Sequence, residues 1–129
     1  MLLDTSGLFA YHHKDESPHE EAKTLFRAEP RKLTHSYVLS ELTTLAYVRG
    51  VPRAYTVNFV TGLIAHPEVE TVWVDERFHR NAMALLLARP DKSHSHRDAM
   101  SFVLMKERGI SDALTTDHHF EQEGFRQLL

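Results

Sequence analysis

The sequence predicts an α/β fold in which a mainly parallel sheet of four to five strands is covered by helices on both faces. Short apolar or β-branched segments recur along the chain, and longer segments with apolar residues at helical spacing separate them. Strands that alternate with helices imply βαβ crossovers, which produce parallel sheets. The length of 129 residues suits a single domain over residues 1–129.

The first predicted strand covers residues 1–3, and Asp4 follows it directly. A strand at the extreme N-terminus must pair inside a sheet to be ordered, and the carboxyl ends of parallel strands form the ligand crevice of such folds. A short helix is predicted over residues 6–13. Asp4 is therefore either part of a site at the sheet edge or only the cap of this helix.

Turn and capping residues delimit the elements of the first half. Ser17, Pro18 and Glu20 predict a helix start with a capping box, and Pro30 ends that helix. Residues 31–35 follow as a short strand. A helix is predicted over residues 36–49, stopped by Gly50, and another begins at Pro52 and ends before Pro67.

The second half follows the same alternation. Residues 69–74 alternate as a β-branched strand should, and Asp75 caps a helix that runs to about residue 89. Ser95 and Asp98 have capping-box spacing before an apolar helix that ends at Gly109. A strand over 113–115 leads to Asp117. A short helical turn and an edge strand over 125–129 complete the chain.

Four carboxylates stand where this fold could bring them together: Asp4, Glu41, Asp98 and Asp117. Acids that follow parallel strands lie on the same edge of the sheet. Converging carboxylates repel one another unless a cation neutralises them, and oxygen-only ligands without cysteine favour Mg²⁺ or Mn²⁺ over zinc. Such ions neutralise charge on a phosphoryl oxygen and activate water, so phosphodiester hydrolysis is the expected chemistry.

The sequence resembles a PIN domain, and especially the VapC-type toxins of bacterial toxin-antitoxin modules. The resemblance rests on residues 1–6, the Ser40-Glu41 pair, residues 95–99, and above all residues 113–120 followed by Gly124-Phe125. It covers essentially the whole chain in the order of the family. It implies an α/β/α sandwich of three layers, Mg²⁺-dependent endoribonuclease activity on RNA, a homodimer, and a small cognate antitoxin as partner.

The same resemblance assigns roles to individual residues. Asp4 and Asp98 match the most direct metal ligands, while Glu41 and Asp117 complete the site or bind through water. Three hydroxyl residues match positions that orient the acids: Thr5, Ser6 and Thr115. Arg97 departs from the family pattern, and it either contacts a substrate phosphate or is a solvated residue at a helix start.

Each acid also has a purely structural interpretation. Asp98 could serve only the capping box with Ser95, Glu41 could be a solvated flank of its helix, and Asp117 could cap the turn that follows it. The four acids would fail to form a site only if all of these structural interpretations were correct at once.

The histidine pairs His94/His96 and His118/His119 leave two interpretations open: a functional one, as a transition-metal site or as an acid or base, and one in which they occupy surface and outer positions around the acids. Neighbouring side chains on a helix diverge by about 100°, which favours the second interpretation. The helices over residues 36–65 carry more apolar surface than one face needs, which predicts self-association.

Composition narrows the remaining choices. The chain has no cysteine, a formal net charge of −3 and no basic leader or bilayer-length apolar run, so we expect a cytoplasmic protein that does not hold nucleic acid by bulk positive charge. A phosphoacceptor receiver domain would need paired acids near the first strand, and a haloacid-dehalogenase-like phosphatase would need a second acid after Asp4. The main alternative is a catalytically silent dimeric module of the same fold that binds RNA or a protein.

Overall fold

The computed structural model describes residues 1–129 and contains one five-stranded sheet whose strands are all parallel. The order across the sheet is β3-β2-β1-β4-β5. The strands are β1 (Leu2–Leu3), β2 (Lys32–His35), β3 (Val69–Val72), β4 (Asp112–Leu114) and β5 (Arg126–Gln127). The predicted parallel sheet is therefore confirmed, with β1 at its centre.

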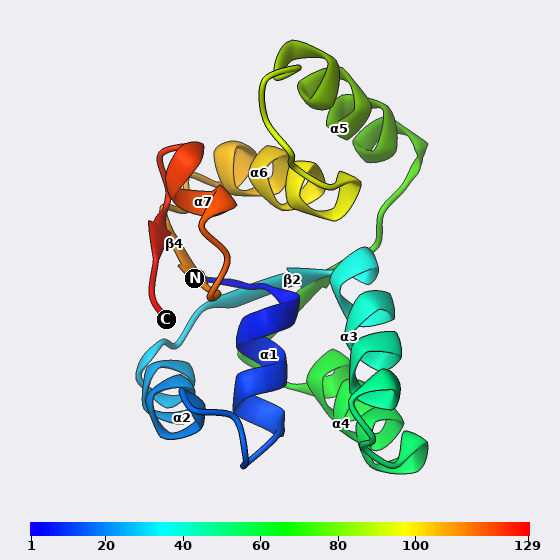
Figure 1. The fold of residues 1–129 in the computed structure, drawn as a ribbon, viewed down its shortest axis with the longest axis vertical. Coiled ribbons are helices and arrows are strands. Elements are labelled where there is room, and N and C mark those ends of the chain that lie inside the picture. Colours follow the sequence, from blue (N-terminus) through cyan, green and yellow to red (C-terminus); the bar gives the residue numbers. More distant parts are fainter.

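Helices cover both faces of the sheet. They are α1 (Thr5–His12), α2 (His19–Ala28), α3 (Ser36–Val48), α4 (Arg53–Ala65), α5 (Glu76–Ala88), α6 (His96–Arg108) and the short α7 (His119–Gln122). Figure 1 shows α5, α6 and α7 on one side of the sheet and α1 to α4 on the other. The α/β/α sandwich is confirmed. None of these helices has the length and apolar character needed to cross a bilayer.

The central strand contributes to a separate core on each face of the sheet. Leu2 packs with α5, α6 and α7 residues such as Phe102, whereas Leu3 packs with α1 to α4 residues such as Leu42. Successive side chains of a strand point to opposite faces, so two adjacent leucines can serve both cores. Burial on both faces holds β1 in place and thereby positions Asp4, which follows the carboxyl end of this strand.

Two of the three predicted helix caps are confirmed. The Asp75 carboxylate accepts from the Phe78 amide at 2.9 Å, and Ser95 with Asp98 forms a complete capping box at the start of α6. The capping box predicted for Ser17 is wrong. Helix α2 begins only at His19, with Pro18 at the N-cap position and no side-chain cap. A tertiary contact defines this start, because the His19 imidazole bonds the Ala10 carbonyl oxygen at 2.8 Å.

Four strands are shorter than predicted, namely β1, β2, β3 and β5, and the reason is clearest for β3. β3 ends at Val72 because its partner β2 ends at His35, which pairs with Val72. Beyond that point Ser36 begins α3, and its hydroxyl accepts from the Val74 amide at 3.0 Å. The alternating pattern of residues 69–74 thus continues past the last residue that pairs with β2. Beyond it, the backbone bonds the first residue of α3 instead.

Gly7 lets α1 lie directly on β4. A Cβ atom at this position would stand 1.9 Å from the Leu114 carbonyl oxygen, which is backbone and cannot give way. We expect Gly7→Ala to lower the free energy of unfolding by about 3 kcal/mol, the upper part of the range for overpacked cores. Gly62→Ala is the matched control, since nothing lies within 4 Å of a Cβ there and an interior helical alanine stabilises by about 1 kcal/mol. Urea unfolding of both variants measures this, and equal effects would contradict it.

His35 makes the stability depend on pH. Its Nδ1 accepts from the Val38 amide, so its Nε2 carries the proton and donates to the Ser101 hydroxyl at 2.9 Å. Burial, with a smaller effect of Arg97, lowers the pKa of His35 from 6.5 to about 3. Below pH 6.5 the unfolded chain therefore takes up a proton that the folded chain does not.

From this difference we expect His35 to reduce the free energy of unfolding by about 1.4 kcal/mol for each pH unit below about pH 6. His35→Gln removes this contribution, so the stability of the parent should fall toward that of the variant as the pH drops. Urea unfolding of both proteins from pH 7.5 down to about pH 4.5 measures the difference. Curves that stay parallel over this range would contradict the prediction.

Candidate metal centre

The structure brings together all four acids that the sequence singled out. Asp4 follows β1, Asp117 follows β4 after two residues, Asp98 lies in the first turn of α6, and Glu41 lies on α3. All four contact the guanidinium of Arg97. Its nitrogens lie 3.5 Å from Asp4, 2.7 Å from Glu41 and 3.4 Å from Asp117, and it also pairs with Asp98.

Two hydroxyls hold Asp4. The Thr115 hydroxyl donates to Asp4 Oδ2 at 2.9 Å and accepts from the Asp117 amide at 3.0 Å. The Ser6 hydroxyl lies 3.0 Å from the Thr115 hydroxyl and accepts from the Thr116 amide at 3.0 Å. These bonds connect the ends of β1 and β4. They restrict the orientation of the Asp4 carboxylate.

Thr5 stands apart from this network. Its hydroxyl is buried and has no hydrogen-bond partner. Its side chain therefore makes no hydrogen bond to the four acids, in contrast to those of Ser6 and Thr115. Its backbone amide does favour the ionised form of Asp4.

The two innermost acids differ in their electrostatics. Burial raises the pKa of Asp4, and the nearby Arg97 and the Thr115 hydroxyl only partly oppose this effect. Burial also acts to raise the pKa of Asp98, but Arg97 and the Ser95 amide outweigh it, so the pKa of Asp98 is lowered. Asp98 is thus the more firmly ionised of the two, whereas the charge on Asp4 destabilises the fold unless a cation compensates it.

The structural interpretation describes real contacts of Asp98 and Asp117, but these contacts occupy only one oxygen of each carboxylate. Asp98 Oδ2 accepts from the Ser95 amide at 2.9 Å, while Oδ1 faces Arg97. Asp117 Oδ1 accepts from the His119 amide at 2.9 Å, and Oδ2 lies toward Arg97. Each carboxylate has enough lone pairs to accept the backbone hydrogen bond and to contact a cation as well. Asp4 makes no side-chain cap bond to α1, and the 46%-exposed Glu41 forms the open side of the site.

Arg97 is not a solvated helix-start residue. Its side chain is 15% exposed and points among the acids. Burial acts to lower its pKa, but Asp4 and Asp98 outweigh this and raise it, so the guanidinium stays charged. The sequence around Arg97 did not indicate that its side chain points toward the acids, because a long side chain at a helix start can point either inward or into solvent.

The folded chain does not keep the histidine pairs of the sequence together. His94 and His119 approach each other, with ring centroids 5.1 Å apart, and the His119 Nδ1 lies 3.0 Å from Asp98 Oδ2. His96 instead stacks edge-on against His79 at 4.2 Å, and His118 bonds Gln127 at 3.0 Å. The surface interpretation is therefore wrong for the buried His94. His119 lies in the outer position around the acids that the sequence favoured.

A divalent cation fits this centre. Asp4 Oδ1 and Arg97 Nε are both buried without a hydrogen-bond partner, 3.5 Å apart. A buried carboxylate oxygen without a hydrogen bond is costly, and one guanidinium cannot balance four carboxylates. The donors are all oxygen, as hard divalent cations prefer. The acids can therefore bind such an ion if the Arg97 guanidinium moves at least partly out of the space between them.

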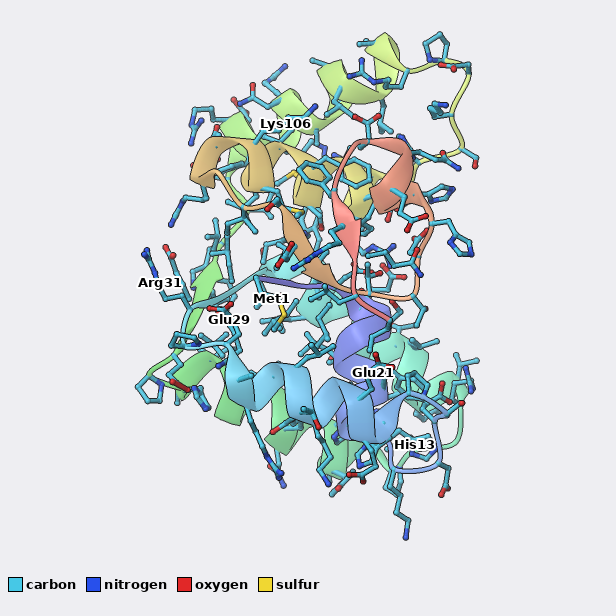
Figure 2. The ribbon with its side chains drawn as sticks, turned by 90° about the vertical axis from the view of Figure 1, so that its left-hand side faces the viewer. Met1, His13, Glu21, Glu29, Arg31 and Lys106 are labelled. Carbon is cyan, nitrogen blue, oxygen red and sulfur yellow. The ribbon has the colours of Figure 1, made fainter.

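Two hollows of the surface lie away from the acids. One hollow is lined by Met1, Glu29, Arg31, Arg108 and Asp112, at the amino-terminal edge of the sheet. Figure 2 shows Met1, Glu29 and Arg31 close together there. The acids follow the carboxyl ends of β1 and β4, at the opposite edge. Of the four acids, Glu41 and Asp117 reach the surface, with side chains 46% and 26% exposed, whereas Asp4 and Asp98 lie buried beneath them.

Comparisons with known proteins agree with this geometry. The PIN domain family model matches residues 1–125. The chain is 30% identical over 129 residues to the 23S rRNA-specific endonuclease VapC20 of Mycobacterium tuberculosis, in strains CDC 1551 / Oshkosh and H37Rv, covering 99% of this chain and 97% of the relative.

The crystal structure of Mycobacterium tuberculosis VapC20, described as a Sarcin-Ricin loop cleaving toxin, superposes with a TM-score of 0.89 at 26% identity. The match covers 98% of this chain and 96% of that one. Sequence, fold and family model thus agree over nearly the whole length. The chain belongs to the PIN domain family, as one of its VapC-type members.

Proposed function

We propose that residues 1–129 form one PIN domain that hydrolyses RNA phosphodiester bonds as a metal-dependent endoribonuclease. The observation that carries this proposal is the convergence of four carboxylates from α3, α6 and the ends of β1 and β4 on a single cation, Arg97. A binding module has no need for such a concentration of buried negative charge, which weakens the fold.

In this proposal Mg²⁺, which Mn²⁺ can replace, is bound by Asp4, Glu41, Asp98 and Asp117. When bound, the ion supplies charge neutralisation at a phosphoryl oxygen and activation of water. Asp4 and Asp98 are the direct ligands, since they are the buried pair. The more exposed Glu41 and Asp117 complete the site or act through water.

The remaining polar residues prepare the site. Thr115 and Ser6 hold the Asp4 carboxylate in one orientation through the bonds described above. Once an ion balances the acids, Arg97 is free to turn toward a substrate phosphate, for which its planar guanidinium is suited. The same side chain thus compensates the acids without metal and binds RNA with it.

The relatives suggest the substrate and partners. Because the VapC20 relative is named a 23S rRNA-specific endonuclease, we propose ribosomal RNA as the substrate, and hence a cytoplasmic location. A small cognate antitoxin is the proposed protein partner.

We also propose a homodimer through α3 and α4, where large apolar side chains are exposed, namely Tyr47, Val48, Tyr55, Val57 and Ile64. Sedimentation at micromolar concentration tests self-association, and a strict monomer would contradict it.

The test is cleavage of a ribosomal RNA fragment and of DNA of the same sequence by the purified protein, with Mg²⁺, with Mn²⁺ and with EDTA. We expect RNA cleavage with either ion and none with EDTA. Melting temperatures should rise with Mg²⁺, because a ligand of the native state stabilises it. A rise in melting temperature without cleavage would favour the catalytically silent binding module. Cleavage in EDTA would overturn the proposed mechanism.

A further inference from the structure

A second group of metal-ligating side chains borders the acids. His94, Asp98 and His119 each place one potential ligand atom within 4.8 Å of the others. His94 precedes α6 and His119 begins α7, so residues far apart in the sequence meet here. Only Asp98 belongs also to the set of four acids. The group differs from that set in kind, because two of its three donors are imidazole nitrogens.

His94 carries a free ring nitrogen in a buried place. Its side chain has no exposed surface, and its Nε2 lies 3.0 Å from Glu123 Oε1. A carboxylate only accepts hydrogen bonds, so Nε2 carries the proton and Nδ1 of the neutral ring bears a lone pair. That Nδ1 is buried and has no hydrogen-bond partner. A buried lone pair without a partner is costly, and a metal ion would satisfy it.

The partner of His94 is itself firmly held. The Glu123 side chain is 3% exposed and contacts Arg89 at 3.0 Å and Lys106 at 3.6 Å. Figure 2 marks Lys106 on α6. Burial acts to raise the pKa of Glu123, but hydrogen bonds from His94 and Arg89 outweigh it and lower the pKa. A carboxylate that binds the outer nitrogen of an imidazole is the usual support of a metal-ligating histidine.

His119 is arranged in a similar way. Its Nε2 lies 3.1 Å from the Ser93 hydroxyl, and its Nδ1 lies 3.0 Å from Asp98 Oδ2 and 3.3 Å from Asp117 Oδ1. Without metal, Nδ1 donates to these carboxylates. When an ion takes Nδ1, the proton moves to Nε2 and donates to Ser93, which accepts as readily as it donates. Each histidine thus has an outer partner for Nε2, and the Nδ1 of His119 faces Asp98.

We propose that His94 Nδ1, His119 Nδ1 and an Asp98 carboxylate oxygen bind a borderline transition-metal ion such as Zn²⁺, at a site distinct from the Mg²⁺ centre but sharing Asp98 with it. Two imidazoles and a carboxylate match the donor preference of Zn²⁺ and leave a fourth position open. Through the shared Asp98, occupancy of this site changes the ligands available to the acid centre. The inference does not depend on RNA cleavage.

The first test observes the imidazole nitrogens of the unmodified protein by ¹⁵N NMR during a Zn²⁺ titration. We expect the Nδ1 signals of His94 and His119 to shift with saturation at one equivalent, while His118, which bonds Gln127 instead, keeps its signal. Unchanged signals of His94 and His119 would overturn the proposal, whether or not the protein cleaves RNA.

The second test measures Zn²⁺ affinity by calorimetry in variants whose melting temperature shows that they are folded. We expect His94→Gln and His119→Gln to weaken binding at least tenfold, and Glu123→Gln to weaken it about tenfold through loss of the outer partner. His118→Gln and Asp4→Asn should leave the affinity unchanged. Loss of binding in Asp4→Asn together with full binding in both His94→Gln and His119→Gln would place the ion among the acids and overturn the proposal.

Discussion

We expect Asp4→Asn to lower the rate of RNA cleavage by about a thousandfold, because several kcal/mol of transition-state stabilisation depend on the bound ion. A neutral amide is a much weaker ligand for a divalent cation than the carboxylate it replaces. The fold should persist, since Asn retains an oxygen that can accept from the Thr115 hydroxyl. Because burial raises the pKa of Asp4, the metal-free variant should melt at the same temperature as the parent or higher.

Initial rates at saturating Mg²⁺ and melting curves with and without Mg²⁺ measure both effects. The control is Asp91→Asn, an exposed carboxylate in the loop before α6 that contacts Lys92 at 3.7 Å. It should change neither the rate nor the metal-dependent rise in melting temperature. Full activity of Asp4→Asn would show that the acids are not the metal centre. A large drop in its metal-free melting temperature would point to a structural role.

Arg97→Gln should make the metal-free protein less stable by about 3 kcal/mol, because it removes one partner from a largely buried ionic cluster. The same change should raise the affinity for Mn²⁺ at least tenfold, since the ion no longer has to displace a guanidinium from the four carboxylates. The two effects have opposite signs and one cause. Melting curves without metal and Mn²⁺ binding followed by electron paramagnetic resonance measure them.

Arg77→Gln is the matched control, because Arg77 is 60% exposed and pairs with Glu107 at the surface. It should alter stability by less than about 1 kcal/mol and leave Mn²⁺ affinity unchanged. If Arg97→Gln weakens Mn²⁺ binding or leaves it unchanged, Arg97 does not compete for the place of the ion. An increase in KM for RNA together with tighter Mn²⁺ binding would support its second role at a substrate phosphate.

Much of the centre could be predicted from local patterns. Asp4 and Asp117 each follow a short apolar strand, and parallel strands present their carboxyl ends at one edge of the sheet. Ser95 and Asp98 have the spacing of a capping box, which the structure contains. The family prediction rests on these same residues and is confirmed by the match over residues 1–125. The roles of the individual acids remain predictions.

Local patterns misled where a tertiary contact outweighed them. Ser17 and Glu20 have capping-box spacing, but the bond between His19 and the Ala10 carbonyl begins α2 two residues after Ser17. The β-branched pattern of residues 69–74 continues beyond the end of β3, which depends on the length of β2. In both cases the deciding partner lies on another element, so the segment itself contains no sign of it.

The sequence by itself determined the type of each element, the parallel sheet and the candidate acids, because strand alternation, helical periodicity and capping act between residues a few positions apart. Only the tertiary structure decided that Arg97 turns into the acids and that His94 meets His119 rather than its neighbour His96. These outcomes depend on the burial of charge and on the packing of α6 and α7 on the same face of the sheet. Such forces act between residues that only the folded chain brings together.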